Sequence, residues 1–213
     1  MIQLKNLKPL PLIEQGIPKS SQIWNKEWTF EKGKNYLVVA PSGKGKSTLL
    51  HCIYGLRKDH EGEVLFNEKN TKDLLSEEWA EIRQKNYSIV FQDLRLFPQL
   101  TAKENILLKS NLQQYKSETE IKEMATRLGI EDLLDKPCHT LSFGQRQRVA
   151  IIRALSQPFD FLLLDEPFSH LDKANIHAAT KLIQDECTAQ GSGLIIVSLG
   201  EQYFFNYDAE VIL

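Results

Sequence analysis

The 213-residue sequence has few cysteines, almost no net charge and no long apolar run. Its three cysteines, Cys52, Cys138 and Cys187, are odd in number and lack the spacing of a metal site. We therefore expect reduced thiols in a structural role, as in a cytosolic protein. A net charge of −2 provides no basic surface for a phosphate backbone, so no nucleic-acid partner is expected.

The apolar runs are short. The longest, 161–164 and 194–197, fall well below the about 20 residues that cross a membrane, and the first residues lack the basic and then apolar layout of a secretory signal. With 42% hydrophobic and 25% charged residues, the composition is that of an ordinary globular protein. A chain of 213 residues suits one domain, with or without an inserted lobe.

Strand-like runs alternate with helical patterns along the chain. The runs that suit strands lie at 2–7, 28–30, 36–40, 62–67, 87–91, 161–164 and 194–197. Helical spacing of apolar residues marks 46–56 and 173–190, and Gly191 ends the second pattern. This alternation predicts an α/β core with a mainly parallel sheet. A polar, helical block at about 100–158 interrupts it and is expected to form a separate lobe.

A glycine-containing loop follows the expected strand at 36–40 and opens a helix, which is the context of a phosphate-binding P-loop. Its backbone N–H groups would wrap the β-phosphate, Lys46 would reach the β- and γ-phosphates, and Ser47 would ligate Mg²⁺. Ala40 stands where the pattern normally has glycine, which suits a backbone at negative φ only. The nucleotide-binding residues predicted here are Ser42, Gly43, Lys44, Gly45, Lys46, Ser47 and Thr48.

The apolar run at 161–164 ends in Asp165, Glu166 and Pro167. A buried strand that ends in two acids places them at the carboxyl edge of the sheet, where α/β proteins bind ligands. We expect Asp165 to hold Mg²⁺ through water and Glu166 to orient and polarise the attacking water.

The segment 141–155 reads LSFGQRQRVAIIRAL and begins a helix. Ser142 and Gln145 form a Ser-x-x-Gln capping box, in which two side chains satisfy free backbone N–H groups. With Gly144 beside it, such a helix start is an anion site, because its N–H groups and dipole point outward. A capping box alone indicates only a helix start, but two phosphate-site motifs in the same chain favour the anion site.

With these motifs, the chain resembles the ATP-binding cassette (ABC) ATPases, and the resemblance covers nearly its whole length. The segment 90–93 resembles the family's Q-loop, with Gln92 sensing Mg²⁺ and the γ-phosphate. The segment 141–145 resembles the signature LSGGQ, with Phe143 in place of the first glycine, and 169–172 resembles the D-loop, which crosses the dimer interface. Residues 97–105 are most similar to the small cassettes of lipoprotein-releasing, macrolide-export and cell-division complexes.

The resemblance implies a P-loop NTPase core with a small N-terminal antiparallel β part and an inserted helical lobe. A single ABC ATPase domain would span 1–213, with the core at about 1–92 and 159–213 and the lobe at about 93–158. ATP and Mg²⁺ would be the cofactors. The catalytic residues would be Lys46, Gln92 and Glu166, and the metal-binding residues would be Ser47, Gln92 and Asp165.

The family mechanism also implies partners. Two subunits would pack head to tail, with ATP between the P-loop of one and Ser142, Gly144 and Gln145 of the other, and Asp172 would lie at the same site. ATP binding would close the dimer, and hydrolysis would open it and power a membrane permease. The second cassette is either identical or related. The expected location is cytoplasmic, peripheral on the inner face of the cytoplasmic membrane.

Two family features are missing. Leu199 stands where the family has a histidine that contacts the γ-phosphate, and leucine forms no hydrogen bond. The loss of one positioned contact costs on the order of 10²-fold in rate, so we expect slow hydrolysis, at least in a homodimer. The aromatic residue that stacks on adenine is also missing, because the first aromatic, Trp24, comes late and suits the core better. An aliphatic residue such as Ile13 or Ile17 is expected to cover the base instead.

Three questions stay open at the sequence level. Leu94, Leu96, Phe97 and Leu100 suit either core packing in the lobe or a groove for a permease helix. The absent histidine also suits an ATP-gated regulatory or binding module with negligible turnover. A cassette acting outside transport is the third possibility, although the chain has no coiled-coil arms, second cassette or basic patch of the kind such proteins carry.

Overall fold

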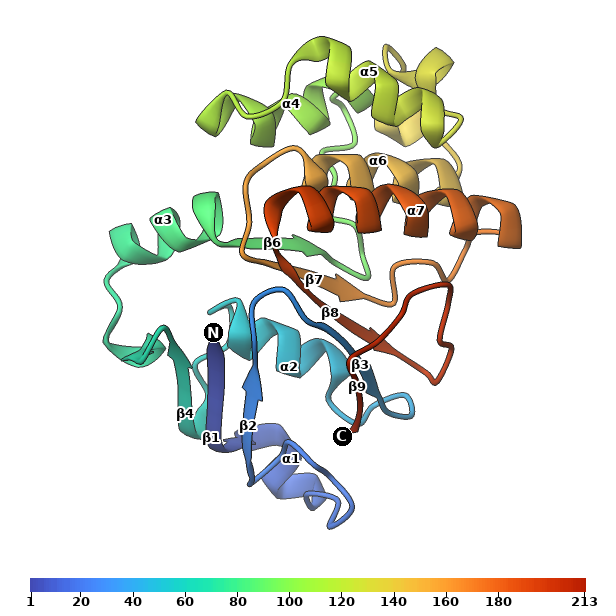
Figure 1. Ribbon diagram of the computed structural model, residues 1–213. Helices are drawn as coiled ribbons and strands as arrows, with labels where there is room; N and C mark the ends of the chain where they lie inside the picture. Colours follow the sequence, from blue (N-terminus) through green and yellow to red (C-terminus); the bar gives the residue numbers. More distant parts are fainter.

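The computed structural model describes residues 1–213 as two sheets with helices around and between them (Figure 1). In chain order the elements are β1 (Ile2–Pro9), α1 (Leu10–Gln15), β2 (Glu27–Phe30), β3 (Asn35–Val39), α2 (Lys46–Ile53), β4 (His60–Phe66), β5 (Lys69–Asn70), α3 (Ser76–Lys85), β6 (Tyr87–Val90), α4 (Ala102–Gln113), α5 (Glu118–Arg127), α6 (Phe143–Leu155), β7 (Phe161–Asp165), α7 (Lys173–Gln190), β8 (Gly193–Ser198) and β9 (Ala209–Ile212). None of the helices combines the length and apolar character needed to span a membrane.

The larger sheet has five strands in the order β6-β7-β8-β3-β9, and every neighbouring pair is parallel. This confirms the predicted α/β core. Successive side chains of a strand point to opposite faces. Leu163 and Ile195 accordingly pack on one side of the sheet, and Leu162 and Leu194 pack on the other. Burial on both faces explains why β7 and β8 read as unbroken apolar runs.

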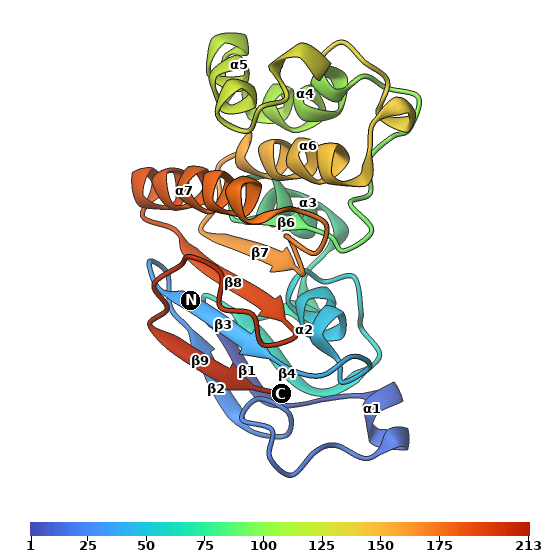
Figure 2. The same ribbon diagram turned by 90° about the vertical axis from the view of Figure 1, so that its right-hand side faces the viewer.

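The smaller sheet is antiparallel, with the order β2-β1-β4-β5, as the resemblance implied for the N-terminal part. Helix α2 lies between the two sheets (Figure 2). Its residues Leu49 and Leu50 share one apolar cluster with Ile2 of β1 and Val197 of β8. The helix that follows the P-loop is therefore buried between two sheets and has a fixed position.

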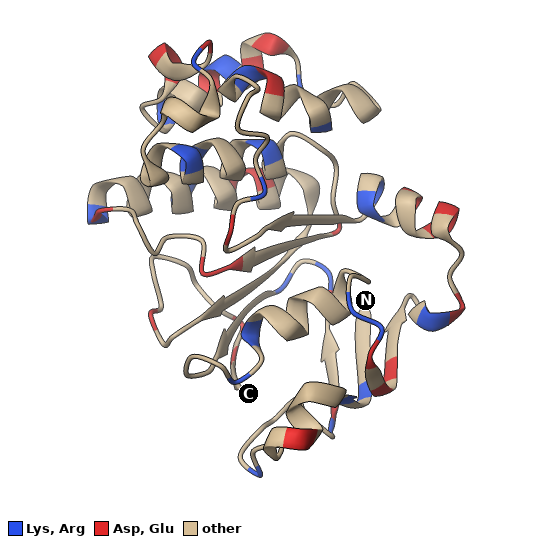
Figure 3. Cartoon of the chain, turned by 180° about the vertical axis from the view of Figure 1, so that it is seen from behind, with Lys and Arg blue, Asp and Glu red and all other residues tan.

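Helices α4, α5 and α6 form the lobe drawn at the top of Figure 1, and α7 packs below α6 against the sheet. The lobe and the core are not separated by solvent, because Ile121 of α5, Ile152 of α6 and Leu164 of β7 belong to one apolar cluster. Acidic and basic residues are intermixed along this lobe (Figure 3).

Two helices were not predicted from the sequence. Helix α1 begins after Pro9 and has Pro11 in its first turn, where prolines are tolerated but give no helical periodicity. Helix α3 is mostly polar and buries only Trp79 and Ile82 along its length. Helix α2 ends at Ile53 instead of 56. Gly55 follows with a φ of +71°, and a Cβ there would lie 2.3 Å from the Trp79 ring.

Candidate functional site

The P-loop joins β3 to α2 and is shaped by its glycines. Gly45 precedes α2 with a φ of +96°, a conformation that L side chains rarely adopt. A Cβ at Gly45 would lie 2.7 Å from Leu12 Cδ1 and 3.1 Å from the Trp24 ring, so both side chains pack closely against the loop. Ala40 is not among the residues with positive φ, so alanine can stand in place of the motif's glycine without backbone strain.

Lys46 is held inside the loop that it belongs to. Its Nζ donates hydrogen bonds to the carbonyl oxygens of Ala40 and Pro41 at 3.0 and 3.2 Å. The same nitrogen lies 3.2 Å from Glu166 Oε1 at the end of β7. The side chain is only 6% exposed. A buried cation with one carboxylate partner and two carbonyls is preorganised for the oxygens of an anionic ligand.

Asp165 ends β7 and is 2% exposed. Burial raises the pKa of its carboxyl group to about 6, although hydrogen bonding to Ser47 opposes the shift. Its Oδ1 atom is buried without a hydrogen-bond partner. A desolvated carboxylate oxygen next to a hydroxyl group fits a hard cation such as Mg²⁺, which prefers oxygen ligands and would relieve the cost of the buried charge.

Gln92 and Glu166 meet beside the P-loop. Gln92 Nε2 lies 3.4 Å from Glu166 Oε2. Glu166 has a φ of +46°, an uncommon backbone conformation for a non-glycine residue, and such strain is often found at functional sites. An open cavity of about 230 Å³ contains these groups. Its lining residues are Pro11, Leu12, Gln15, Ser42, Gly43, Gly45, Lys46, Ser47, Thr48, Gln92 and Glu166.

The start of α6 contains the capping box that the sequence pattern predicted. The Gln145 N–H donates to Ser142 Oγ at 3.3 Å, and the Ser142 N–H donates to Gln145 Oε1 at 2.8 Å. A Cβ on Gly144 would lie 2.9 Å from the His170 carbonyl oxygen, so only glycine allows this close approach. Ser142, Gly144 and Gln145 do not line the P-loop cavity of their own chain.

Asp172 forms a cap within its own chain. It precedes α7, and its carboxylate accepts hydrogen bonds from the backbone N–H and side-chain amide of Asn175 at 2.8 and 3.0 Å. These bonds, the backbone one first, hold the pKa of Asp172 below its ordinary value. The Asn175 side chain in turn accepts a hydrogen bond from Arg148 of α6 at 3.0 Å, which ties the D-loop region to the signature helix.

A second cavity, of about 510 Å³, shares Ser47 and Gln92 with the P-loop cavity. Ser47, Gln92 and Asp165 line it together with residues to which the sequence analysis gave no role at the nucleotide. These additional residues are His51, Phe91, Asp93, Arg95, Phe143 and His170. Four of them lie within the segments 90–93, 141–145 and 169–172, whereas no sequence pattern singled out His51 or Arg95.

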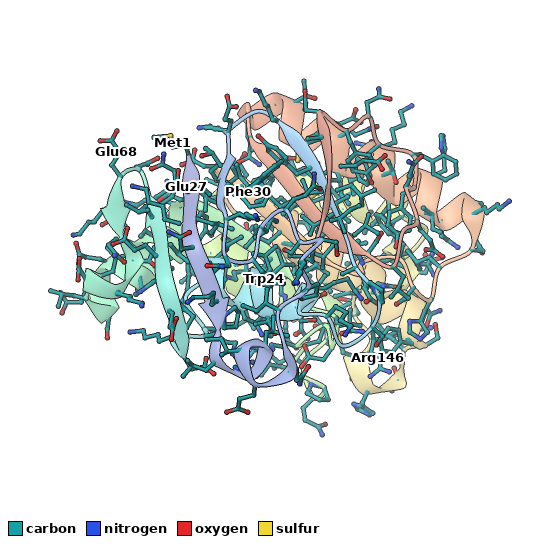
Figure 4. All side chains as sticks on the ribbon, turned by 90° about the horizontal axis from the view of Figure 1, so that it is seen from below. Met1, Trp24, Glu27, Phe30, Glu68 and Arg146 are labelled. Atoms are coloured by element: carbon teal, nitrogen blue, oxygen red, sulfur yellow. The ribbon has the colours of Figure 1, made fainter.

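The structure shows the surroundings of the residues connected with the two missing family features, the histidine and the aromatic residue on adenine. Leu199 follows β8 and is 59% exposed, so burial in the apolar core does not explain why leucine replaces the histidine. Trp24 is buried, which confirms the prediction that it belongs to the core, and it lies away from the outline of the molecule in Figure 4. The part of α1 that reaches the P-loop cavity is Pro11, Leu12 and Gln15, and neither Ile13 nor Ile17 lines it.

The apolar residues after Gln92 divide between the two roles left open. Leu94 is buried in the main apolar cluster, and Leu96 and Leu100 are half-buried. Phe97 is 56% exposed. Core packing therefore accounts for Leu94, and the exposed ring of Phe97 remains available to a partner.

Comparison with known proteins gives consistent matches. A family model described as ABC transporter matches residues 24–169. The ABC transporter ATP-binding protein YxdL of Bacillus subtilis is 38% identical over 68% of this chain, and the matched part is 58% of YxdL. The thiamine import ATP-binding protein ThiQ of Haemophilus ducreyi is 35% identical over 78% of this chain and 77% of its own length. The chain spans 51% of two uncharacterised Mycobacterium tuberculosis relatives.

Solved structures agree with the sequence matches. The dimeric structure of MJ0796, a bacterial ABC transporter cassette, superposes with a TM-score of 0.80 at 31% identity and covers 93% of this chain and 88% of that one. A dimeric post-hydrolysis state of the same cassette, bound to ADP and phosphate, has a TM-score of 0.78 at 30% identity and covers 99% and 96%.

Proposed function

We propose, because the chain belongs to the ABC transporter family, that it is an ATP-binding subunit whose ATP-driven dimerisation powers a membrane permease. The observation that carries this proposal is the convergence of Lys46, Gln92 and Glu166 on one cavity beside the P-loop. These residues come from three separate segments and meet only in the folded chain. We also propose that core and lobe form one cassette domain, with the lobe at about 93–158.

ATP would bind with its phosphates in the P-loop cavity. The N–H groups of residues 42–48 would surround the β-phosphate, and Lys46 would exchange its carbonyl partners for phosphate oxygens. Ser47 and Asp165 would hold Mg²⁺, and Gln92 would complete the site from the Q-loop. The unpartnered Oδ1 of Asp165 supports this assignment. The metal would neutralise part of the phosphate charge.

Hydrolysis would use Glu166 and a water molecule. Glu166 would accept a hydrogen bond from the water and orient its oxygen toward the γ-phosphorus. A new bond forms between that oxygen and phosphorus, and the bond from phosphorus to the bridging oxygen of ADP breaks. The proton of the water passes to Glu166 and then to solvent, which leaves ADP and inorganic phosphate. The contacts of Glu166 with Gln92 at 3.4 Å and with Lys46 at 3.2 Å would hold the carboxylate beside the P-loop before the nucleotide binds.

The signature residues would act on the ATP of a second subunit. Ser142, Gly144 and Gln145 lie at a helix start and outside the P-loop cavity of their own chain. In a head-to-tail dimer their N–H and side-chain groups would contact the γ-phosphate held by the partner. ATP thus joins the two subunits, and loss of the γ-phosphate releases them.

Turnover is expected to be slow, because Leu199 supplies no donor to the γ-phosphate. The same observation favours a second candidate function, an ATP-gated regulatory or binding module with negligible turnover. Phe97 and the half-buried Leu96 and Leu100 would form part of the permease contact. This contact would hold the chain on the inner face of the cytoplasmic membrane.

The test compares the wild-type chain with Glu166→Gln. Mg²⁺-ATP should convert Glu166→Gln into a stable dimer on size-exclusion chromatography, because ATP still binds and is not hydrolysed. ADP should leave it monomeric, and the wild-type chain should release phosphate slowly while Glu166→Gln releases none. An ATP-driven dimer without any phosphate release by the wild-type chain would favour the regulatory module. Absence of ATP binding and of a dimer would overturn both candidate functions.

A further inference from the structure

The turn that follows Gln92 has an uncommon backbone conformation. Leu94 has a φ of +61° and Arg95 has a φ of +45°, which is a left-handed conformation that residues with a Cβ rarely adopt. The turn is tight, because the Leu94 N–H donates a hydrogen bond to the Phe91 carbonyl oxygen at 2.9 Å. Strained residues of this kind persist only where the surrounding structure holds them, and they are often found at functional sites.

One arginine side chain holds both strained residues. Arg153 of α6 donates hydrogen bonds from Nη1 to the Arg95 carbonyl oxygen at 2.7 Å and from Nη2 to the Leu94 carbonyl oxygen at 2.6 Å. The Arg153 side chain forms no other hydrogen bond, and none of the ion pairs of the chain includes it. The planar fork of a guanidinium group suits two adjacent carbonyl oxygens, whereas the compact ammonium group of lysine does not.

Arg153 reaches the nucleotide site only through this turn. It lines neither the P-loop cavity nor the second cavity, whereas Gln92 lines both. Helix α6 packs beside β6, the strand that leads to Gln92 (Figure 2). Because only Asp93 lies between Gln92 and Leu94, relaxation of the turn to negative φ would displace the Gln92 amide from Glu166, which it contacts at 3.4 Å.

We propose that Arg153 is a positioning residue for ATP hydrolysis, whose two hydrogen bonds maintain the left-handed turn and thereby hold the Gln92 amide where Mg²⁺-ATP binds. The proposal rests on the proposed function, because Gln92 needs a bound nucleotide to act on. Arg153 itself touches neither the substrate nor the metal. An amide oxygen is among the ligands that Mg²⁺ prefers, so its displacement would weaken metal binding and slow hydrolysis together.

Arg83 of α3 provides a matched control. Its Nε and Nη2 donate to the successive carbonyl oxygens of Tyr54 and Gly55 at 3.2 and 3.1 Å. Like Arg153 it is half-buried, and Gly55 also has a positive φ. Arg83, Tyr54 and Gly55 do not line either nucleotide cavity. Substitution of Arg83 by lysine therefore removes an equivalent pair of hydrogen bonds at a place that does not hold Gln92.

The first experiment uses the nucleotide-free chain. Amide hydrogen exchange is measured by mass spectrometry on peptides that cover residues 91–97. Arg153→Lys should raise exchange there on the order of tenfold, because the turn opens more often. Arg153→Gln, which adds no buried charge, should raise it as well and serves if the lysine variant unfolds. Arg83→Lys should exchange like the wild-type chain in this segment. Unchanged exchange in both Arg153 variants would overturn the proposal.

The second experiment measures steady-state phosphate release at varied Mg²⁺ and ATP concentrations. Arg153→Lys should lower kcat on the order of tenfold and raise the Mg²⁺ concentration that gives half-maximal rate, because the support of a metal ligand is lost. KM for ATP at saturating Mg²⁺ should stay close to that of the wild-type chain, since Lys46 and the P-loop are unchanged. Arg83→Lys should match the wild-type chain in all three values.

A third comparison tests whether backbone strain is the cause. In the Arg153→Lys background, Arg95→Gly and Arg95→Ala remove the same side chain, but only glycine adopts a positive φ without a steric penalty. Arg95→Gly should therefore recover part of the turnover and slow the exchange of residues 91–97, relative to Arg95→Ala. Equal behaviour of the two double variants would mean that Arg153 does not act by holding a strained turn, and the proposal would be wrong.

The kinetic outcomes separate this inference from the proposed function. If the wild-type chain releases no phosphate with Mg²⁺-ATP, the proposed ATPase function fails, and the role of Arg153 in hydrolysis fails with it. If the wild-type chain hydrolyses ATP and Arg153→Lys has the same kcat and Mg²⁺ dependence as Arg83→Lys, the proposed function stands and the role of Arg153 alone is refuted.

Discussion

At the scale of single residues, Leu199 is expected to limit turnover. Leu199→His should raise turnover by about ten- to a hundredfold, because it returns a donor to the γ-phosphate of the same chain. Steady-state phosphate release of the wild-type chain and of Leu199→His tests this. Equal turnover of the two chains would mean that the residue at this position does not limit hydrolysis.

Asp165 should give the nucleotide-free chain a distinct pH dependence. Its pKa is raised by burial to about 6, above the about 3.9 of an unfolded aspartate, so the native chain binds this proton more tightly. Its contribution to the free energy of unfolding therefore falls as pH rises from about 4 to about 6 and stays low above that.

Asp165→Asn should remove that slope. At neutral pH the nucleotide-free variant should gain up to about 3 kcal/mol in free energy of unfolding, while stabilisation by Mg²⁺-ATP should shrink because a metal ligand is lost. Urea unfolding from pH 4 to pH 8 is the measurement, with Asp132→Asn, an exposed aspartate, as control. If the free energy of unfolding changed with pH in the same way for the wild-type chain and Asp165→Asn, burial would not be the cause of a raised pKa at Asp165.

At the scale of elements, two glycines at helix ends should differ in their tolerance of alanine. Gly55 follows α2 at a φ of +71°, and its Cβ would lie 2.3 Å from the Trp79 ring of α3. Gly191 follows α7 at a φ of +58° with nothing within 4 Å. Gly55→Ala should cost roughly 2 to 4 kcal/mol through strain and overpacking, and Gly191→Ala about 1 kcal/mol through backbone strain alone. Urea unfolding would measure both, and equal costs would exclude the Trp79 contact as the cause.

The elements also indicate where sequence reasoning succeeds. Residues 173–190 were predicted as a helix and form α7 with the same bounds, because the apolar stripe and Gly191 are local signals. Helices α1 and α3 were missed, because their residues contact distant parts of the chain and have little periodicity of their own. Leu12 of α1 supports Gly45 of the P-loop, a contact that no pattern within residues 10–15 reveals.

At the scale of the whole molecule, the three thiols should report unfolding as one event. Cys52, Cys138 and Cys187 are free and buried. Burial raises the pKa of Cys52 to about 12 and that of Cys187 to about 11, and it also raises the pKa of Cys138. Since the thiolate is the reactive form, a thiol reagent should leave the native chain unmodified at neutral pH. In concentrated urea all three should react.

Labelling in intermediate urea would test whether lobe and core unfold together. Cys138 precedes the signature and Cys187 lies on α7, yet both belong to one apolar cluster. Their labelling rates, read by mass spectrometry, should therefore match each other and the loss of helical circular dichroism. Earlier labelling of Cys138 would mean that the lobe opens on its own, against the proposed single domain.

The sequence by itself determined the parts of this protein that local patterns encode. The strand-loop-helix of the P-loop, the acid pair after β7, the capping box at Ser142 and the parallel sheet all depend on neighbouring residues and on periodicity. Because these signals occur in the order found in one family, they also indicated the family.

Tertiary structure alone decided which distant side chains meet. The contact of Gln92 with Glu166, the hydrogen bonds of Arg153 to the turn at 94–95 and the exposure of Leu199 each depend on how separate elements pack. Such contacts form only when the chain closes large loops around a common core, and no local pattern records that geometry. The sequence therefore revealed the missing histidine, whereas only the fold revealed the arginine that holds the turn after Gln92.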